Sequence, residues 1–260
     1  MTKRRKTRKV KIGNVEIGGN APIAIESMTK TDTRAIDDTL DEIRKLKRAG
    51  CEIVRVAVKD RGSIISLKKI IKDSELPIVA DIHFLPQLAL DSIKSGVQAI
   101  RLNPGNITRK SDIEAIIKSA KERKISIRIG VNSGSLRIRC GTIAHSMVKS
   151  ALDYIKIFEK ASFYDIIISL KSSDVIETVN AYRKMSALCD YPFHVGITAA
   201  GPFLTSTVKS SIGIGVLLEE TVTRKLVPSM TEDRTSITNV GKLDVSIVTG
   251  RGNDQLPSAP

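Results

Sequence analysis

Residues 49–84 read AGCEIVRVAVKDRGSIISLKKIIKDSELPIVADIHF, and this stretch decides the fold. Residues 53–58 are β-branched and almost continuously apolar, which is typical of a strand buried on both faces of a parallel sheet. Residues 63–73 then place apolar side chains at helical spacing, and residues 77–81 return to a short apolar run. This order predicts two parallel strands joined by a helix.

The same alternation continues on both sides of this stretch. We expect strands at residues 23–28, 53–58, 77–81, 99–102, 125–130, 164–170 and 193–197, and helices at residues 36–48, 63–73, 87–95, 145–161 and 205–218, with two more opening at residues 111 and 174. Residues 111–114 (SDIE) have capping-box spacing, which predicts the start of the fourth helix. Seven such units in about 200 residues favour a closed barrel over an open sheet.

The eighth unit of the barrel is the weak part of the pattern. From residue 221 the sequence is rich in Thr, Ser, Asn, Gly and Pro, and Pro228 interrupts the candidate eighth strand at residues 225–230. No amphipathic eighth helix follows, and only residues 243–248 resemble another strand. The expected fold is α/β, a TIM-type (β/α)8 barrel whose eighth unit is degraded or incomplete.

These patterns divide the chain into three segments. We expect a basic N-terminal arm at residues 1–12, a barrel domain at residues 13–220, and a divergent, poorly ordered tail at residues 221–260. The formal charge is +14, and half of it lies in the arm. Such an arm can bind nucleic acid, but aromatic residues are 3% of the chain and none lies among the basic ones. A solvated, frayed terminus is the simpler interpretation.

The location of the protein follows from what the chain lacks. No apolar run reaches about 18 residues, so we expect no membrane contact. No apolar signal core follows the basic start, which predicts a cytoplasmic protein. The cysteines lie far apart and form no C-x-x-C pair, so the sequence shows no local metal motif: Cys51, Cys140 and Cys189.

Cations gather at the carboxyl ends of the expected strands, where the active sites of barrels form. Four of them lie within or at the end of apolar strands: Arg55, Arg101, Arg128 and Lys171. Salt bridges to Glu52, Asp81 or Asp165 would explain any one of these cations. Four together favour a ligand with two phosphates, because guanidinium groups match phosphate oxygens.

Neutral and titratable side chains accompany these cations. Asn103, Asn132, Ser172 and Ser173 are available for hydrogen bonds. The two serines precede a helix, where they either help to bind an anion or cap the helix, and both roles can hold. His83 follows a strand beside Asp81, which suits general acid–base catalysis, although a structural histidine explains it equally well. His145 and His194 lack such company.

Seven segments, taken in order, resemble the 4-hydroxy-3-methylbut-2-enyl diphosphate synthase family. They are residues 22–33 (PIAIESMTKTDT), 49–58 (AGCEIVRVAV), 77–84 (PIVADIHF), 100–107 (IRLNPGNI), 127–136 (IRIGVNSGSL), 168–174 (ISLKSSD) and 207–218 (TVKSSIGIGVLL). The resemblance covers about residues 10–220, and residues 227–233 (VPSMTED) still echo the family's eighth strand.

The resemblance implies a reaction and a set of partners. The family reductively converts 2-C-methyl-D-erythritol 2,4-cyclodiphosphate to 4-hydroxy-3-methylbut-2-enyl diphosphate, in the non-mevalonate pathway to isoprenoids. Its barrel holds the diphosphate, a separate domain holds a [4Fe-4S] cluster, and flavodoxin or ferredoxin supplies electrons to a homodimer. On this basis we assign Asp81 and His83 to catalysis, and we add Lys209 to the substrate-binding residues named above.

The chain departs from the family in two places. The S-C-P-x-C pattern of the cluster domain does not occur, so we expect the cluster ligands to be absent and the reading frame to be truncated or disrupted. Residues 196–201 read GITAAG where the family usually has GVTEAG, so Ala199 replaces an acid. The alternatives are a non-catalytic remnant, a scaffold that needs a separate cluster-bearing chain, and a phosphate-binding barrel similar to pterin-ligand synthases.

Overall fold

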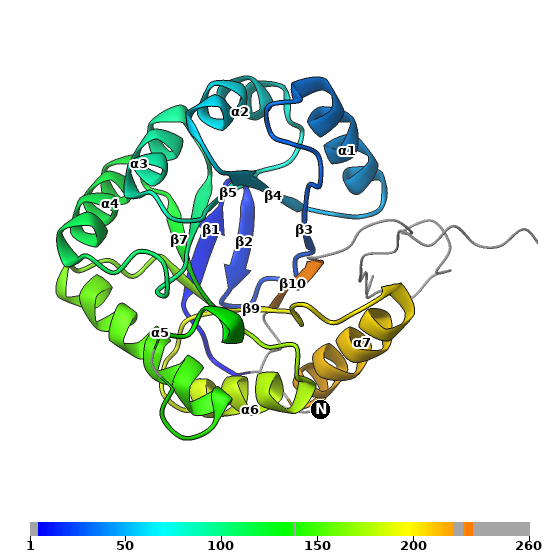
Figure 1. Cartoon of the computed structure of the whole chain (residues 1–260), viewed down its shortest axis with the longest axis vertical. Coiled ribbons are helices and arrows are strands. Elements are labelled where there is room, and N and C mark those ends of the chain that lie inside the picture. Colours follow the sequence, from blue (N-terminus) through cyan, green and yellow to red (C-terminus); the bar gives the residue numbers. More distant parts are fainter. Residues whose placement is uncertain (1–4, 138, 221–225, 231–260) are drawn as a thin grey trace, which may run out of the picture.

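Eight parallel strands close into a barrel, and helices surround it (Figure 1). The structure is a computed structural model that describes residues 5–137, 139–220 and 226–230. The barrel strands are β3 (Glu26–Met28), β4 (Ile53–Val58), β5 (Ile78–Ile82), β6 (Ala99–Leu102), β7 (Ser126–Asn132), β8 (Ile166–Lys171), β9 (Phe193–Val195) and β10 (Leu226–Met230). Their order around the barrel follows the sequence, with β10 between β9 and β3. The predicted (β/α)8 architecture is therefore confirmed.

The outer layer consists of helices that follow the strands in turn. They are α1 (Ile36–Arg48), α2 (Arg61–Asp73), α3 (Pro86–Ser95), α4 (Lys110–Arg123), α5 (Ile143–Lys160), α6 (Val175–Ser186) and α7 (Phe203–Glu219), with a short turn η1 (Ser133–Ser135) after β7. Asp174 caps α6 by accepting a hydrogen bond from the Glu177 N–H, as its position in the sequence suggests. The capping box at residues 111–114 is wrong, since α4 begins at Lys110 without a side-chain cap.

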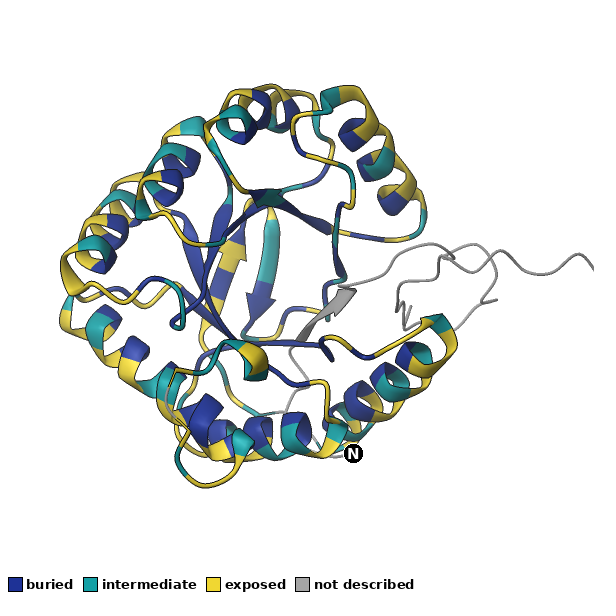
Figure 2. Ribbon diagram, in the orientation of Figure 1, coloured by how far each residue is buried: buried dark blue, intermediate teal, exposed yellow. Residues whose placement is uncertain are grey.

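Side chains alternate along each strand between the helices and the barrel interior. On β4, Val54, Val56 and Val58 belong to the core under the helices. Ile53 instead joins a small interior cluster at the amino ends of the strands, with Val79, Ala99 and Ile167. Figure 2 shows the barrel strands β4 to β9 almost entirely buried and the outward faces of the helices exposed. Parallel strands covered on both faces account for the continuous apolar runs in the sequence.

An antiparallel hairpin closes the amino-terminal end of the barrel. It consists of β1 (Lys9–Ile12) and β2 (Val15–Gly18), and its Val10, Ile12 and Ile17 pack in the interior cluster. Arg5 also has fixed partners, because it donates to the carbonyls of Cys189 and Tyr191, each at 2.6 Å. The interpretation of the N-terminus as frayed is thus wrong for Arg5 and for residues 9–12. Arg5 has hydrogen-bond partners, and Val10 and Ile12 are buried in the core.

The eighth strand forms despite its proline. β10 pairs in parallel with both β9 and β3, and this pairing closes the barrel. Residues 221–225 and 231–260, which include the possible strand at 243–248 and most of the expected tail, lie outside the described residues. Within the described part of the chain, no helix combines the length and apolar character that crossing a membrane requires.

Candidate functional site at the barrel mouth

The barrel interior changes from apolar to charged toward the carboxyl ends of the strands. The interior apolar cluster at the amino ends of the strands includes Ile53 and Val79. Two residues further along the same strands, the next side chains that point inward are charged: Arg55 on β4 and Asp81 on β5. Barrel interiors are filled in layers by side chains from alternate strands. Here the alternate strands β3, β5, β7 and β9 each contribute one buried polar side chain: Glu26, Asp81, Arg128 and His194. The strands between them supply Arg55, Arg101 and Lys171.

Asp81 joins two of the predicted cations. Its carboxylate lies 3.1 Å from Arg101 Nη1 and 3.5 Å from Arg55 Nε, and all three side chains are buried. Burial alone would raise the pKa of Asp81, but the charges of Arg101 and Arg55 outweigh it and hold that pKa well below its usual range. A carboxylate held in this state suits the orientation of two guanidinium groups better than the exchange of a proton.

Gly130 makes room for one of these guanidinium groups. Arg101 Nη2 donates to the Gly130 carbonyl at 3.0 Å, and a Cβ atom at residue 130 would lie 2.5 Å from Arg101 Nε. Any side chain at residue 130 would therefore push Arg101 away from its present position. The absence of a side chain at Gly130 therefore allows Arg101 to take its position in the site.

Arg128 has partners that the sequence analysis missed. Its Nη1 lies 2.6 Å from Glu26 Oε1 and 2.7 Å from His194 Nδ1. Glu26 is on β3, on the opposite side of the ring of strands from β7, so this ion pair crosses the interior. Burial lowers the pKa of His194 well below its usual range, and the nearby charges of Arg128 and Lys171 lower it further. His194 is thus a neutral acceptor for Arg128.

The described part of the mouth carries more positive than negative charge. Among the described residues, four buried cations (Arg55, Arg101, Arg128 and Lys171) accompany two buried carboxylates (Glu26 and Asp81), which leaves an excess of two positive charges. Arg128 Nη2 is buried and has no hydrogen-bond partner among those residues. Guanidinium and ammonium groups gathered at one mouth, one of them with an unused N–H donor, are suited to an anion.

The other predicted residues take different places around this cluster. Asn103 is buried; its Nδ2 donates to Ser135 Oγ at 2.9 Å, and its Oδ1 accepts from the Gly105 N–H at 2.9 Å. Asn132 ends β7 and is partly buried. Ser172 Oγ accepts a hydrogen bond from the Asp174 N–H at 3.2 Å, one residue before α6 begins. The side chain that caps α6 belongs to Asp174 and not to a serine. Lys209 lies on α7, in the outer layer of helices, and is partly buried.

The loop after β9 carries the substituted acid position. Ala199 is exposed and has a φ of 49°, a left-handed backbone conformation that favours glycine. Because Ala199 is exposed, its side chain is not part of the buried cluster. Its backbone conformation is strained for a residue other than glycine.

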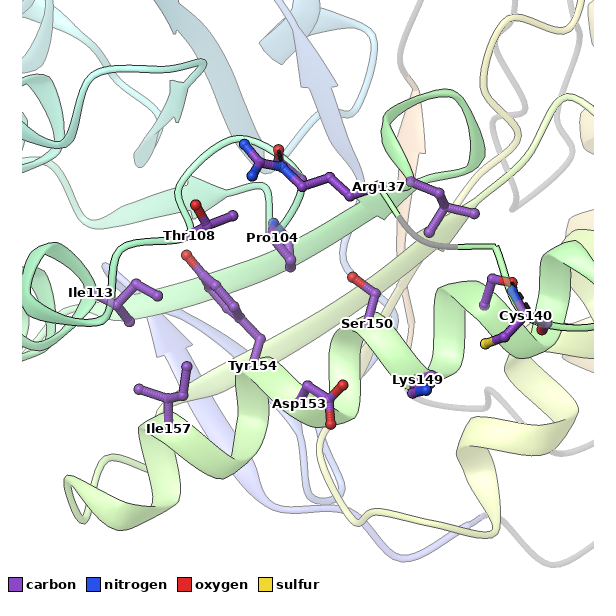
Figure 3. Close-up of a pocket in the computed structure, with 13 residues that line it drawn as sticks. Pro104, Thr108, Ile113, Arg137, Cys140, Lys149, Ser150, Asp153, Tyr154 and Ile157 are labelled. Carbon is purple, nitrogen blue, oxygen red and sulfur yellow. Dashed lines mark hydrogen bonds between the residues drawn. The ribbon is translucent and has the colours of Figure 1, made fainter.

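A cavity beside α5 lies outside the cation cluster. It encloses about 220 Å³, and its walls include Tyr154, Cys140 and Lys149 (Figure 3). Tyr154 donates to the carbonyl of Ile107 at 2.7 Å, and burial raises its pKa. None of the predicted site residues lines this cavity.

The described residues do not provide a site for an iron–sulfur cluster. Among them, no three His, Cys, Asp or Glu side chains are placed to hold a metal. Cys51 and Cys189 precede β4 and β9 at the amino ends of the strands, whereas Cys140 follows β7 at the mouth. Burial raises the pKa of Cys51 to about 12, so its thiol stays protonated and is a poor metal ligand.

The fold and the mouth define a (β/α)8 barrel whose described residues place four buried cations in one site. The family model of the GcpE TIM-barrel domain matches residues 7–242, which extends past residue 220, the expected end of the barrel domain. The chain is 50% identical over 238 residues to 4-hydroxy-3-methylbut-2-en-1-yl diphosphate synthase (flavodoxin) of Lawsonia intracellularis, covering 90% of this chain and 66% of that protein. It is 48% identical over 255 residues to the synthase of the same name from Thermodesulfovibrio yellowstonii, covering 96% and 73%. The chain belongs to this synthase family and spans about two thirds of the length of these relatives.

Solved structures with little sequence identity share the architecture. Dihydropteroate synthase from Yersinia pestis superposes with a TM-score of 0.60 at 8% identity, covering 85% of this chain and 91% of that chain. A truncated 3-deoxy-D-arabino-heptulosonate 7-phosphate synthase from Thermotoga maritima gives 0.56 at 12% identity, covering 86% and 80%. At these identities the likeness concerns the fold alone.

Proposed function

We propose that this chain is the substrate-binding barrel of a 4-hydroxy-3-methylbut-2-en-1-yl diphosphate synthase. Its ligand would be 2-C-methyl-D-erythritol 2,4-cyclodiphosphate, whose two phosphates would lie on Arg55, Arg101, Arg128 and Lys171. The main support is the gathering of four buried cations at one barrel mouth, together with the unpartnered Nη2 of Arg128. Asn103, Asn132 and Ser172 would add neutral hydrogen bonds at the same strand ends.

The reaction adds two electrons and two protons, opens the ring and releases one water. In the family, the electrons come from flavodoxin through a [4Fe-4S] cluster, whose ligands are not among the described residues. This chain would bind and orient the cyclic diphosphate, and His83 at the mouth would carry a proton. Asp81 would act by holding Arg55 and Arg101. A homodimer and a cytoplasmic location remain expectations from the resemblance and the sequence.

Calorimetry with the cyclic diphosphate tests this proposal. Arg101→Ala and Lys171→Ala should each weaken binding by about 1.5–3 kcal/mol, the usual value for a hydrogen bond to a charged group. The matched controls are Arg44→Ala and Lys156→Ala, which remove exposed cations of the outer helices. If the folded wild type does not bind, the remnant alternative replaces the enzyme. If both mouth variants bind as well as the wild type does, the residues are structural only.

Position 199 gives a second test that concerns turnover. A relative's cluster-bearing domain, supplied in trans with reduced flavodoxin, should give faster product formation with Ala199→Glu than with the unmodified barrel. General acid–base groups contribute roughly 10²–10⁴-fold. Equal rates would mean that Ala199 is a tolerated substitution and that the acid is not needed here.

A further inference from the structure

The cavity between α4 and α5 is lined by none of the four cations of the mouth (Figure 3). It is formed by the loops after β6 and β7 and by one face of α5. Its volume of about 220 Å³ has room for about seven groups of the size of a water molecule. Because protein interiors are close-packed, a cavity of this size with both apolar and charged walls indicates a binding site for a small molecule.

Part of the cavity wall is apolar. Its side chains come from α4, from α5 and from the loop after η1: Ile113, Leu136, Tyr154 and Ile157. The Tyr154 ring is buried, and its hydroxyl group is already used, because it donates to the carbonyl of Ile107 at 2.7 Å. Tyr154 therefore offers a ligand mainly apolar surface, and this part of the wall suits a short hydrocarbon body.

Two cations with unused hydrogen-bond donors line the same cavity. Arg137 donates through Nε to the Gly105 carbonyl at 2.7 Å, and its two Nη groups have no partner among the described residues. Lys149 of α5 has no ion-pair partner in the described part of the chain. Asp153 also lines the cavity, but its carboxylate lies 3.3 Å from Lys156 Nζ, which offsets its charge. Arg137 and Lys149 are therefore available to an anion.

We propose that this cavity binds the phosphate monoester of a short apolar alcohol, with the hydrocarbon body on the apolar wall and the phosphate on Arg137 and Lys149. A phosphate monoester carries about 1.5 to 2 negative charges at pH 7, which matches two cations. Its oxygens accept hydrogen bonds from a guanidinium group and from an ammonium group. The site uses none of the cations of the mouth, so it does not depend on the proposed function.

The cavity and the mouth are neighbours. Asn103 donates to Ser135 Oγ at 2.9 Å, and the residues that follow these two, Pro104 and Leu136, line the cavity. A phosphate in solution has both places within reach, so the test needs variants of each.

The probe is hexyl phosphate, and isothermal titration calorimetry measures its binding to the whole chain. Inorganic phosphate and 1-hexanol should each bind at least about tenfold more weakly than hexyl phosphate, because the first leaves the apolar wall uncovered and the second leaves the cations without an anion. If the folded wild type does not bind hexyl phosphate, or binds inorganic phosphate equally well, the proposal is overturned.

Variants of the cavity locate the probe. Arg137→Gln should weaken binding of hexyl phosphate about tenfold to a hundredfold, as expected for a lost hydrogen bond to a charged group. Arg139→Gln is the matched control, since Arg139 is exposed two residues further along and does not line the cavity. Figure 3 shows Ser150 pointing from α5 toward the loop that carries Pro104, so Ser150→Leu should fill the cavity and abolish binding.

Ser211→Leu places the same bulk at a half-buried serine of α7 and should bind hexyl phosphate as the wild type does. Should Ser150→Leu fail to fold, Lys149→Gln replaces it, with the same loss expected as for Arg137→Gln. If the folded cavity variants bind as well as the wild type does, the cavity is not a site. A loss seen only in Arg101→Ala would place the probe at the mouth and would likewise overturn the proposal.

Discussion

His194 makes a quantitative prediction about stability in weak acid. Its imidazole is 1% exposed, accepts a hydrogen bond from Arg128, and has a pKa held well below its usual range by burial and the surrounding cations. The folded protein therefore keeps His194 neutral, while the unfolded chain binds a proton below about pH 6.5. Because the unfolded state then binds more protons, stability falls as pH falls through this range.

The size of this effect follows from proton linkage. One group with an unfolded pKa of about 6.5 reduces the free energy of unfolding by about 1.4 kcal/mol per pH unit below that value, or about 2 kcal/mol between about pH 7.5 and about pH 5.0. Carboxylates with lowered pKa values, such as Asp81, contribute mainly at lower pH. The window above about pH 5 therefore isolates His194.

Urea denaturation at the two pH values, followed by circular dichroism, measures the loss. His194→Gln can still accept a hydrogen bond from Arg128 and should lack this loss of about 2 kcal/mol. His145→Gln, which removes an exposed imidazole on α5, should retain it. Equal pH dependence in the wild type and in His194→Gln would refute the buried, neutral histidine.

Three further predictions concern the backbone and the core. Gly130→Ala should displace Arg101 and weaken pyrophosphate binding about tenfold, the effect of losing roughly one charged hydrogen bond. Gly134→Ala is the control, since residue 134 lies in the turn η1 just after β7 with open space around it, and this variant should bind normally in the same titration. Ile12→Ala should lower the free energy of unfolding by about 2–4 kcal/mol, since Ile12 is buried in the barrel floor, and a change near zero in urea would mean that the hairpin does not pack there. Ala199→Gly should raise the melting temperature by relieving the left-handed backbone, a gain of about 0.5–1 kcal/mol, whereas the control Ala200→Gly should not.

The strands and helices were predictable because their signals are local. Residues 53–58 and 36–48 carry the periods of a buried strand and an amphipathic helix, and β4 and α1 occupy these residues. The cations were predictable for the same reason, since Arg55 and Arg128 stand out inside apolar runs. Parallel topology then places the ends of successive strands at one mouth.

The missed features depend on contacts between distant parts of the chain. Glu26 lies on a strand of only three residues, and its partner Arg128 is 102 residues away across the barrel interior. His194 appears isolated in the sequence because Arg128, 66 residues earlier, supplies its company. The hairpin was hidden by its charge, although Val10 and Ile12 alternate with lysines as a half-buried strand should.

The location of the ligand is the most direct test of the whole account. A crystal structure of this chain with 2-C-methyl-D-erythritol 2,4-cyclodiphosphate should show phosphate oxygens within hydrogen-bond distance of Arg101, Arg128 and Lys171, with Asp81 still holding Arg101. Phosphates bound elsewhere on the barrel, with Arg101 and Arg128 left in their present ion pairs, would contradict it.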